Sequence, residues 1–408
     1  MLVLVMVQAA IARPGTAGFL ADPYPYYAWL RERDPVQFDV RTRRWVISRY
    51  TDVARLLGEE WLGKRALTEA GFARLPWLLQ PFARARFQHS SASLLVQDPP
   101  DHTRLRTLMS KAFSARAVQA LEGDIERMAS ELLDRLAPGG GMDVMADFAA
   151  PLPVAVISRM LGVPAEHMPR LHAWSGDLAA QLQTEPSFSA IRRAASAAQA
   201  FINYLGPIIQ ARREQPRDDI LSGLIQAEEA GDRLTTPELY ANVITLLVAG
   251  HETTTNLIGN GVLALSRHPD QAELLRQEPG LLPNAVEELL RFDSPAQRVR
   301  RVTLTEMEVG GRAIPAGQFV TLELGSANRD PAHFAQPEAL DVRREEQRHV
   351  AFGHGPHFCL GAALARLEGR IAFGQLMERF PGMRLAADRL EWRRNDTLRG
   401  LRSLPVRF

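Results

Sequence analysis

The stretch Phe352-Gly353-His354-Gly355-Pro356-His357-Phe358-Cys359-Leu360-Gly361 contains the only cysteine of the 408-residue chain. Its glycines allow tight turns and let the backbone approach a flat cofactor closely. A helical pattern begins near Leu360, so we expect the helix dipole and free N–H groups to lower the pKa of the Cys359 thiol and favour thiolate. A lone cysteine is more often an inert core residue, but this glycine-rich setting favours a ligand.

Outward from this loop, the next strong pattern is a long apolar helix. Thr236 is expected to cap it, and it should end near Arg267, which makes it about 45 Å long. The helix is apolar nearly all round, so it should cross the centre of the protein. The run Ala249-Gly250-His251-Glu252-Thr253-Thr254-Thr255 interrupts it with poor helix formers. We therefore expect a local distortion and a groove beside Gly250.

The rest of the chain favours a mainly helical fold with small β-sheets. Strands are expected at 36–40 and 45–48, and 62–96 has no clean period and predicts a long irregular segment. No linker or repeat divides the chain, so we expect a single domain over 1–408. Further helices are predicted at 22–34, 101–109, 115–136, 152–161, 165–182, 187–213 and 218–230.

Composition narrows the classes of function. The net charge of +1 gives no basic field for nucleic acid, and a single cysteine forms no internal disulfide. The apolar residues 1–10 are too few for a membrane span, which needs about 20, and no basic segment precedes them as in a signal peptide. We expect a soluble, cytoplasmic protein without a membrane span.

The cysteine stretch resembles the haem-binding signature of the cytochrome P-450 family. The run 249–255 is similar to that family's oxygen-activation motif, and Glu288-Leu289-Leu290-Arg291 to its Glu-x-x-Arg motif. Similar matches are Asp98 to Arg106, Ala327-Asn328-Arg329-Asp330-Pro331 and Arg399-Gly400-Leu401, typical of soluble bacterial members, many of them in secondary metabolism. The resemblance covers roughly 22–408. It implies one helical domain with haem between the long central helix and the helix after the cysteine loop.

The resemblance also implies the cofactor site. Cys359 would be the axial ligand of a haem b iron, where a thiolate donates electron density and favours O–O cleavage. His102, Arg106, Arg301 and His357 would bind the haem propionates, as charge-assisted partners do. The other residues implied to contact haem are Ala249, Gly250, Phe352, Gly353 and Gly361.

Four further residues have implied roles. Glu252 and Thr253 match the family's acid–alcohol pair, which would deliver protons during oxygen activation. Since neighbours on a helix are about 100° apart, one of them should face the haem and the other a solvent channel. Glu288 and Arg291 would form a buried structural pair joined by Arg344, serving folding and haem retention.

A substrate pocket is expected above the haem. Gln183 and Gln297 would orient a substrate, and polyketides, terpenoids, fatty acids and aromatic peptides remain open as substrates. The predicted apolar lining consists of Leu94, Leu95, Leu182, Ile244, Val248, Ala296 and Val299, which would equally serve as ordinary core residues.

The function implied is a monooxygenase that inserts one oxygen atom of O2 into a mostly apolar small molecule. Electrons from NAD(P)H would arrive through a separate ferredoxin and ferredoxin reductase. Positive side chains on the cysteine side of the haem would attract the acidic ferredoxin. They are Arg104, Lys111, Arg343, Arg344 and Arg348. A peroxide-driven enzyme, a haem-based gas sensor and a catalytically idle binding protein are the alternatives, and turnover of NADH with a surrogate ferredoxin pair separates them.

Overall fold

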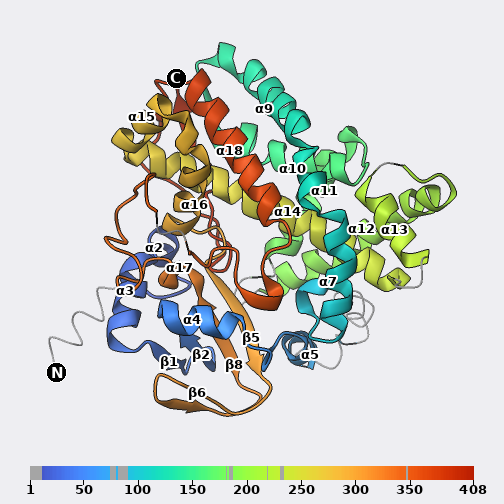
Figure 1. Cartoon of the computed structure of the whole chain (residues 1–408), viewed down its shortest axis with the longest axis vertical. Helices are drawn as coiled ribbons and strands as arrows, with labels where there is room; N and C mark the ends of the chain where they lie inside the picture. The colour runs from blue at the N-terminus through green and yellow to red at the C-terminus, as the bar shows by residue number, and fades with distance from the viewer. Residues whose placement is uncertain are drawn as a thin grey trace.

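The computed structural model describes residues 12–73, 80, 91–180, 182, 187–217, 219–229, 234–345 and 348–408. As predicted, the fold is mainly helical with small sheets (Figure 1). The α-helices of the described residues are α2 Ala17–Ala21, α3 Tyr24–Arg33, α4 Tyr50–Leu57, α5 Arg65–Ala73, α7 Asp101–Ala112, α8 Ala115–Gln119, α9 Glu122–Leu136, α10 Pro151–Met160, α11 Met168–Ala180, α12 Phe188–Glu214, α13 Ile220–Glu229, α14 Thr236–Arg267, α15 Pro269–Gln277, α16 Leu282–Phe292, α17 Leu324–Ala327 and α18 Ala362–Arg379. A π-helix, Val144–Ala149, precedes α10.

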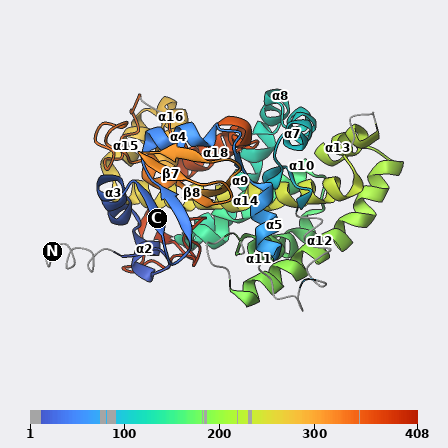
Figure 2. The same cartoon turned by 90° about the horizontal axis from the view of Figure 1, so that it is seen from below.

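Helix α14 runs across the molecule and is the long central helix that the sequence predicts (Figure 2). Its N-cap is Thr235 rather than Thr236, because Thr235 and Glu238 form a capping box. Most of its second half is buried, and it packs against α10, α11, α16 and α18. The helix that follows the cysteine loop, α18, therefore lies directly against the central helix.

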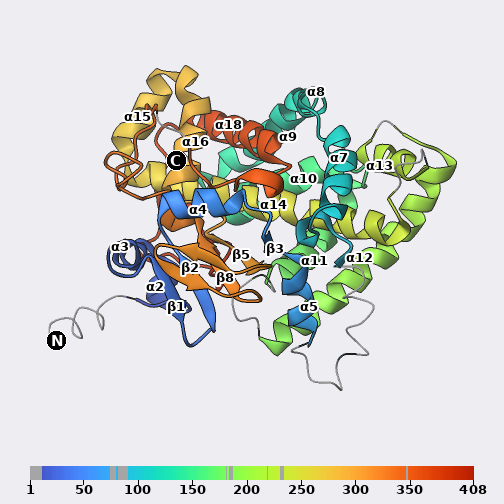
Figure 3. The same ribbon diagram turned by 60° about the horizontal axis from the view of Figure 1, so that its bottom comes forward.

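The strands form three small sheets. The largest has the order β1-β2-β8-β5-β3, with the hairpin of β1 Val36–Asp39 and β2 Arg44–Ile47 at one edge. β2 pairs in parallel with β8 Phe319–Glu323, which pairs antiparallel with β5 Arg298–Thr303. This sheet lies beside α2, α3 and α4, while α9 to α13 gather on the other side of the molecule (Figure 3). The remaining strands are β3 Leu62–Gly63, β4 Gly141–Asp143, β6 Met307–Val309, β7 Arg312–Ile314, β9 Arg384–Leu385 and β10 Pro405–Arg407.

Three sequence predictions of local structure are wrong. The segment 62–96 was expected to be irregular, but it begins with β3 and the helix α5. The single helix expected over 115–136 is two helices, since α8 ends before Ala120 and α9 starts at Glu122. Helix α11 begins at Met168, because Ala165–His167 forms a separate 3-10 turn. Each error lies where a short turn interrupts an otherwise continuous apolar period.

The Glu288 and Arg291 pair lies where the sequence predicts, in the core. Arg291 donates to both oxygens of Glu288 at 2.6 and 2.8 Å, and each side chain is at most 1% exposed. Arg344 donates to Glu288 Oε2 at 3.1 Å, as expected from the sequence. Arg291 also donates to the carbonyls of Asn328, Pro337 and Ala339. The pair therefore ties helix α16 to the loop that precedes the cysteine stretch.

None of the described helices is both long enough and apolar enough to cross a membrane.

Candidate haem and oxygen site

The cysteine loop is held by backbone hydrogen bonds and two left-handed glycines. Cys359 N donates to Phe352 O at 2.9 Å, which closes the loop. Gly353 and Gly355 have φ of 72° and 69°, a region that side chains rarely adopt. A Cβ on Gly355 would lie 2.6 Å from Gly58 Cα, so the loop also packs closely against the end of α4. These constraints place Cys359 just before α18, whose N-cap is Gly361.

The Cys359 side chain is exposed on one side of this loop. Its pKa is nevertheless raised, because desolvation by the surrounding chain outweighs the Gly361 N–H and the charge of Arg106. The expectation that the helix terminus alone lowers the thiol pKa is therefore wrong. A thiolate at this position requires an additional positive partner, and a metal ion is such a partner.

A cluster of buried cationic and imidazole groups lies next to the cysteine loop. His102 is 2% exposed and Arg301 3% exposed, and the rings of His102 and His357 are 4.1 Å apart. Arg106 Nη1 donates to Phe358 O at 2.6 Å, which joins α7 to the cysteine loop. The structure thus brings together the four residues predicted to bind the propionates.

Lys64 is a fifth member of this cationic cluster, and the sequence reasoning missed it. It is 9% exposed, and desolvation together with Arg301 lowers its pKa well below the usual value. The nearest acid, Asp98, accepts from the backbone N–H groups of Lys64 and Arg65 at 2.8 and 3.1 Å. Lys64 lies within the segment 62–96 that was expected to be irregular, and only its being one of two lysines set it apart in the sequence.

We call Lys64, His102, Arg106, Arg301 and His357 the cationic cluster. Its positive charge comes from the lysine and the two arginines, because the pKa values of His102 and His357 are both lowered and their imidazoles are neutral at neutral pH. Desolvation and the charges of Lys64 and Arg106 lower the pKa of His102 to about 4, and desolvation lowers that of Arg301 to about 10. His102 Nε2 has no hydrogen-bond partner, and none of the five forms an ion pair with a carboxylate among the described residues.

Buried cations are stable only with an anionic partner. Two propionate groups of a haem supply that charge, so the residues present fit this cofactor. The neighbouring arginines serve elsewhere: Arg298 pairs with Glu323 and Asp396, and Arg300 Nη2 donates to Leu182 O. Only Arg301 of this group of arginines belongs to the cationic cluster.

Helix α14 continues unbroken through the predicted oxygen-activation motif. Thr253 Oγ1 donates to Ala249 O at 2.8 Å, and Thr254 Oγ1 donates to Gly250 O at 3.1 Å. Ala249 is exposed, whereas a Cβ on Gly250 would lie 3.4 Å from Ile157 of α10. The open face therefore carries Ala249, and the groove expected beside Gly250 stays a prediction.

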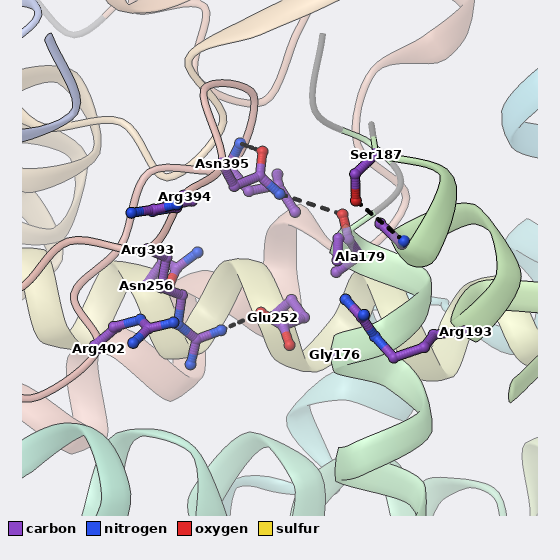
Figure 4. Close-up of a pocket in the computed structure, with 13 residues that line it drawn as sticks. Gly176, Ala179, Ser187, Arg193, Glu252, Asn256, Arg393, Arg394, Asn395 and Arg402 are labelled. Atoms are coloured by element: carbon purple, nitrogen blue, oxygen red, sulfur yellow. Dashed lines mark hydrogen bonds and ion pairs between the residues drawn. The ribbon is translucent and has the colours of Figure 1, made fainter. Parts of the chain in front are cut away.

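Glu252 lies on a different face of α14 and is 3% exposed. Its Oε2 is 2.8 Å from Arg393 Nη1, and its Oε1 is 3.4 Å from His251 Nε2. Desolvation by itself would raise its pKa, but His251 and Arg393 outweigh burial and lower it to about 2. Glu252 lines a cavity of about 590 Å³, which Figure 4 shows. The Glu252 carboxylate therefore borders this cavity, whereas its neighbour Thr253 is not among the residues that line it.

The predicted substrate-pocket residues differ in burial, and some of them lie close to one another in pairs. Ile244 and Val248 share a face of α14, and Ala296 and Val299 pack against the hydrophobic core of the five-stranded sheet. Leu94 is buried, Leu95 is 45% exposed, and Leu182 is half-buried. Their grouping into one pocket stays a prediction.

The two glutamines predicted to orient a substrate have different outcomes. Gln297 is 2% exposed, donates to Ser294 O at 2.8 Å and packs against Gly325, so it is a core residue. Gln183 lies outside the described residues.

The basic residues expected on the cysteine side are largely paired. Arg344 is bound to Glu288, Arg343 pairs with Glu278, and Arg104 pairs with Glu238. Lys111 is exposed. Arg344 is therefore part of the core network and not of a docking surface.

Comparisons with known proteins agree with this geometry. The family model described as Cytochrome P450 matches residues 64–382. Cytochrome P450 107B1 of Saccharopolyspora erythraea is 44% identical over 402 residues, which are 95% of this chain and 96% of that protein. The Vitamin D(3) 25-hydroxylase of Pseudonocardia autotrophica is 41% identical, over 95% of this chain and 94% of that protein.

Solved structures share the fold. The cytochrome P450 PksS of the bacillaene polyketide synthase of Bacillus subtilis 168 has a TM-score of 0.87 and 37% identity. The match covers 97% of this chain and 99% of that one. A glycine-rich cysteine loop, a buried cationic cluster that fits haem propionates, and this likeness along nearly the whole chain lead to one conclusion: the chain belongs to the cytochrome P450 family of monooxygenases.

Proposed function

We propose that this enzyme hydroxylates or epoxidises a mostly apolar small organic molecule, with haem b held through Cys359. The cationic cluster beside the cysteine loop carries this proposal, because its lysine and arginines have no carboxylate partner among the described residues and two propionates would neutralise them. Haem supplies the activation of O2 when bound. The named relatives include a vitamin D(3) 25-hydroxylase and a cytochrome P450 of a polyketide synthase. They support a small-molecule oxygenase and leave the particular substrate open.

The protein's own groups have separate tasks in this proposal. Cys359 supplies the thiolate, and the cationic cluster holds the propionates. Ala249, Gly250, Phe352, Gly353 and Gly361 bring the backbone of α14 and the cysteine loop close to the cofactor, as the family resemblance implies.

Glu252 and Thr253 are proposed to move protons between solvent and the reacting oxygen. Glu252 is ionised at neutral pH, since its pKa is about 2, and it borders a cavity with room for water. Thr253 occupies the next position on α14, and its hydroxyl proton is engaged with Ala249 O, which leaves its lone pairs free to accept a hydrogen bond. The Glu252 carboxylate would take up a proton from solvent water and release it through water toward Thr253, which is general acid catalysis through a short chain.

Electrons are proposed to come from NAD(P)H through a ferredoxin and its reductase. Family membership implies a redox partner. Lys111 is an exposed cation on α7, the helix that binds the cysteine loop through Arg106, so it remains available to an acidic partner.

The test is turnover of the haem-loaded protein with a surrogate ferredoxin, its reductase, NADH and a compound that shifts the haem spin state. We expect the product to contain one oxygen atom from 18O2. Controls that lack both reductase and peroxide should form no labelled product. Product formation with peroxide alone, and none with the reductase system, would contradict the proposal and favour a peroxide-driven enzyme.

A further inference from the structure

A polar cavity of about 590 Å³ lies between α12, α14 and the C-terminal segment, in the size range of small-molecule sites. Figure 4 shows Arg193 on one side and the arginines of the C-terminal segment on the other, with Glu252 between them. We call it the arginine-lined cavity. Its lining consists of Gly176, Ala179, Ala180, Ser187, Ala190, Arg193, Glu252, Asn256, Arg393, Arg394, Asn395, Leu398 and Arg402.

The lining has a surplus of positive charge, because it holds four arginines and one carboxylate. Arg393 pairs with Glu252 at 2.8 Å, Arg193 pairs with Asp177 at 2.9 Å, and Arg402 lies 4.0 Å from Glu391. Arg394 is exposed and has no ion pair or hydrogen bond within the described ranges. One guanidinium at the cavity is therefore available to an anion, and the others add to the attractive potential.

An independent observation, at the buried end of the cavity, is the side chain of Asn256. It is 1% exposed, and neither its Nδ2 nor its Oδ1 has a hydrogen-bond partner. The amide packs directly against Gly400, where a Cβ would clash with it, so it is held in place. An unsatisfied buried amide is destabilising, and a ligand or water in the cavity would supply the missing hydrogen bonds. Glu252 Oε1, which lies 3.4 Å from His251 Nε2, is a second buried acceptor beside the cavity.

These groups define a ligand by its chemistry. Arg394 and Asn256 Nδ2 are donors for an anionic oxygen, whereas Asn256 Oδ1 is an acceptor that lacks a donor such as a hydroxyl. We propose that the arginine-lined cavity binds a small hydroxylated carboxylate, with its carboxylate toward the arginines and its hydroxyl toward α14. This site goes beyond the proposed oxidation, because the bound molecule is not turned over. The site lies against Glu252, so a bound molecule would share the cavity with the water of the proposed proton path.

The test is calorimetric titration of the purified haem-loaded protein with malate at constant ionic strength. We expect saturable binding, at least about fivefold weaker in Arg394→Gln because one charge-assisted bond is lost. Arg389→Gln is the matched control, since Arg389 is also exposed on the C-terminal segment but does not line the cavity. Its affinity should equal that of the wild type.

Two further titrants separate the parts of the ligand. Succinate lacks the hydroxyl and should bind more weakly than malate, while neutral 1,4-butanediol should not bind. Malate heats that do not saturate, or that are the same in Arg394→Gln and the wild type, would overturn the site. Equal affinities for malate, succinate and inorganic phosphate would overturn the hydroxyl contact. These outcomes are independent of product formation, so they remain distinguishable from a failure of the proposed oxidation.

Discussion

Thr253 and Thr254 make the same bond on α14, each to the carbonyl four residues earlier. They differ in exposure, because Thr254 is 2% exposed and Thr253 is half-buried on the face that carries the exposed Ala249. A role in bending the helix would therefore be shared by both threonines. A role in handling protons belongs to Thr253 alone, and this difference makes the pair its own control.

Thr253→Ala should keep oxidising NADH while releasing much of the consumed oxygen as peroxide, because the hydroxyl that holds a water beside the reacting oxygen is gone. The measurement is product formed per NADH, with peroxide assayed in parallel. Thr254→Ala should stay coupled. Equal uncoupling in both variants would show that the two hydroxyls act only through the helix backbone.

Substituting Lys64 should have opposite effects without and with the cofactor: it should stabilise the apoprotein but weaken haem retention. In the chain without haem Lys64 is a desolvated cation, so Lys64→Met should raise the free energy of unfolding of the apoprotein. In the haem-loaded protein it would neutralise a propionate, so the same substitution should speed haem transfer to apomyoglobin, by at least about fivefold for ~1 kcal/mol.

The matched control for Lys64 is Lys111→Met, since Lys111 is the only other lysine and is exposed. It should leave both quantities unchanged. Faster haem transfer together with a less stable apoprotein would place Lys64 in a purely structural role, and unchanged haem transfer would remove it from the site.

At the scale of elements, the cysteine loop is packed between α4 and α18 and depends on one glycine. Gly355→Ala puts a side chain on a left-handed residue and against the Gly58 backbone, which together should cost about 2–4 kcal/mol. Chemical unfolding of the haem-loaded protein measures this. Gly382→Ala is the control, because Gly382 follows α18 in open space with negative φ. Equal stability of the two variants would mean that the loop shifts at no cost.

The sequence predicts the long elements well because they follow a sustained apolar period. Helix α14 ends at Arg267 as expected, and the β1–β2 hairpin lies at its predicted residues. Helix α5 was missed because it is short and lies in a segment, 62–96, whose sequence as a whole has no clean period. The break between α8 and α9 was missed because nothing interrupts the apolar period there.

Site residues within motifs could be located from the sequence, while those that depend on tertiary contact could not. His102, Arg106, Arg301 and His357 do come together, but Lys64 joins them from a distant segment without a motif. The partner of Glu252, Arg393, is 141 residues away, and no local pattern marks it. The state of the Cys359 thiol was also out of reach, since desolvation is a property of the folded surroundings.

At the scale of the whole molecule, the Glu288–Arg291 pair joins α16 to the loop before the cysteine stretch. Glu288→Gln leaves Arg291 and Arg344 without their buried carboxylate, which should cost about 3–5 kcal/mol and reduce haem content. Glu273→Gln is the control, because Glu273 and Arg276 have the same spacing on α15 but are exposed, and the loss there should be under about 1 kcal/mol. Similar losses in both variants would contradict the role of the buried network.

The central claim is that Cys359 binds the haem iron as a thiolate. The most direct measurement is the absorption spectrum of the reduced carbon monoxide complex of the wild type and of Cys359→Ser, each reconstituted with haem. The wild type should show the red-shifted band of thiolate-ligated haem, and the variant should lose it together with oxygen insertion. A red-shifted band that persists in Cys359→Ser would contradict the account, because no other thiol exists in the chain.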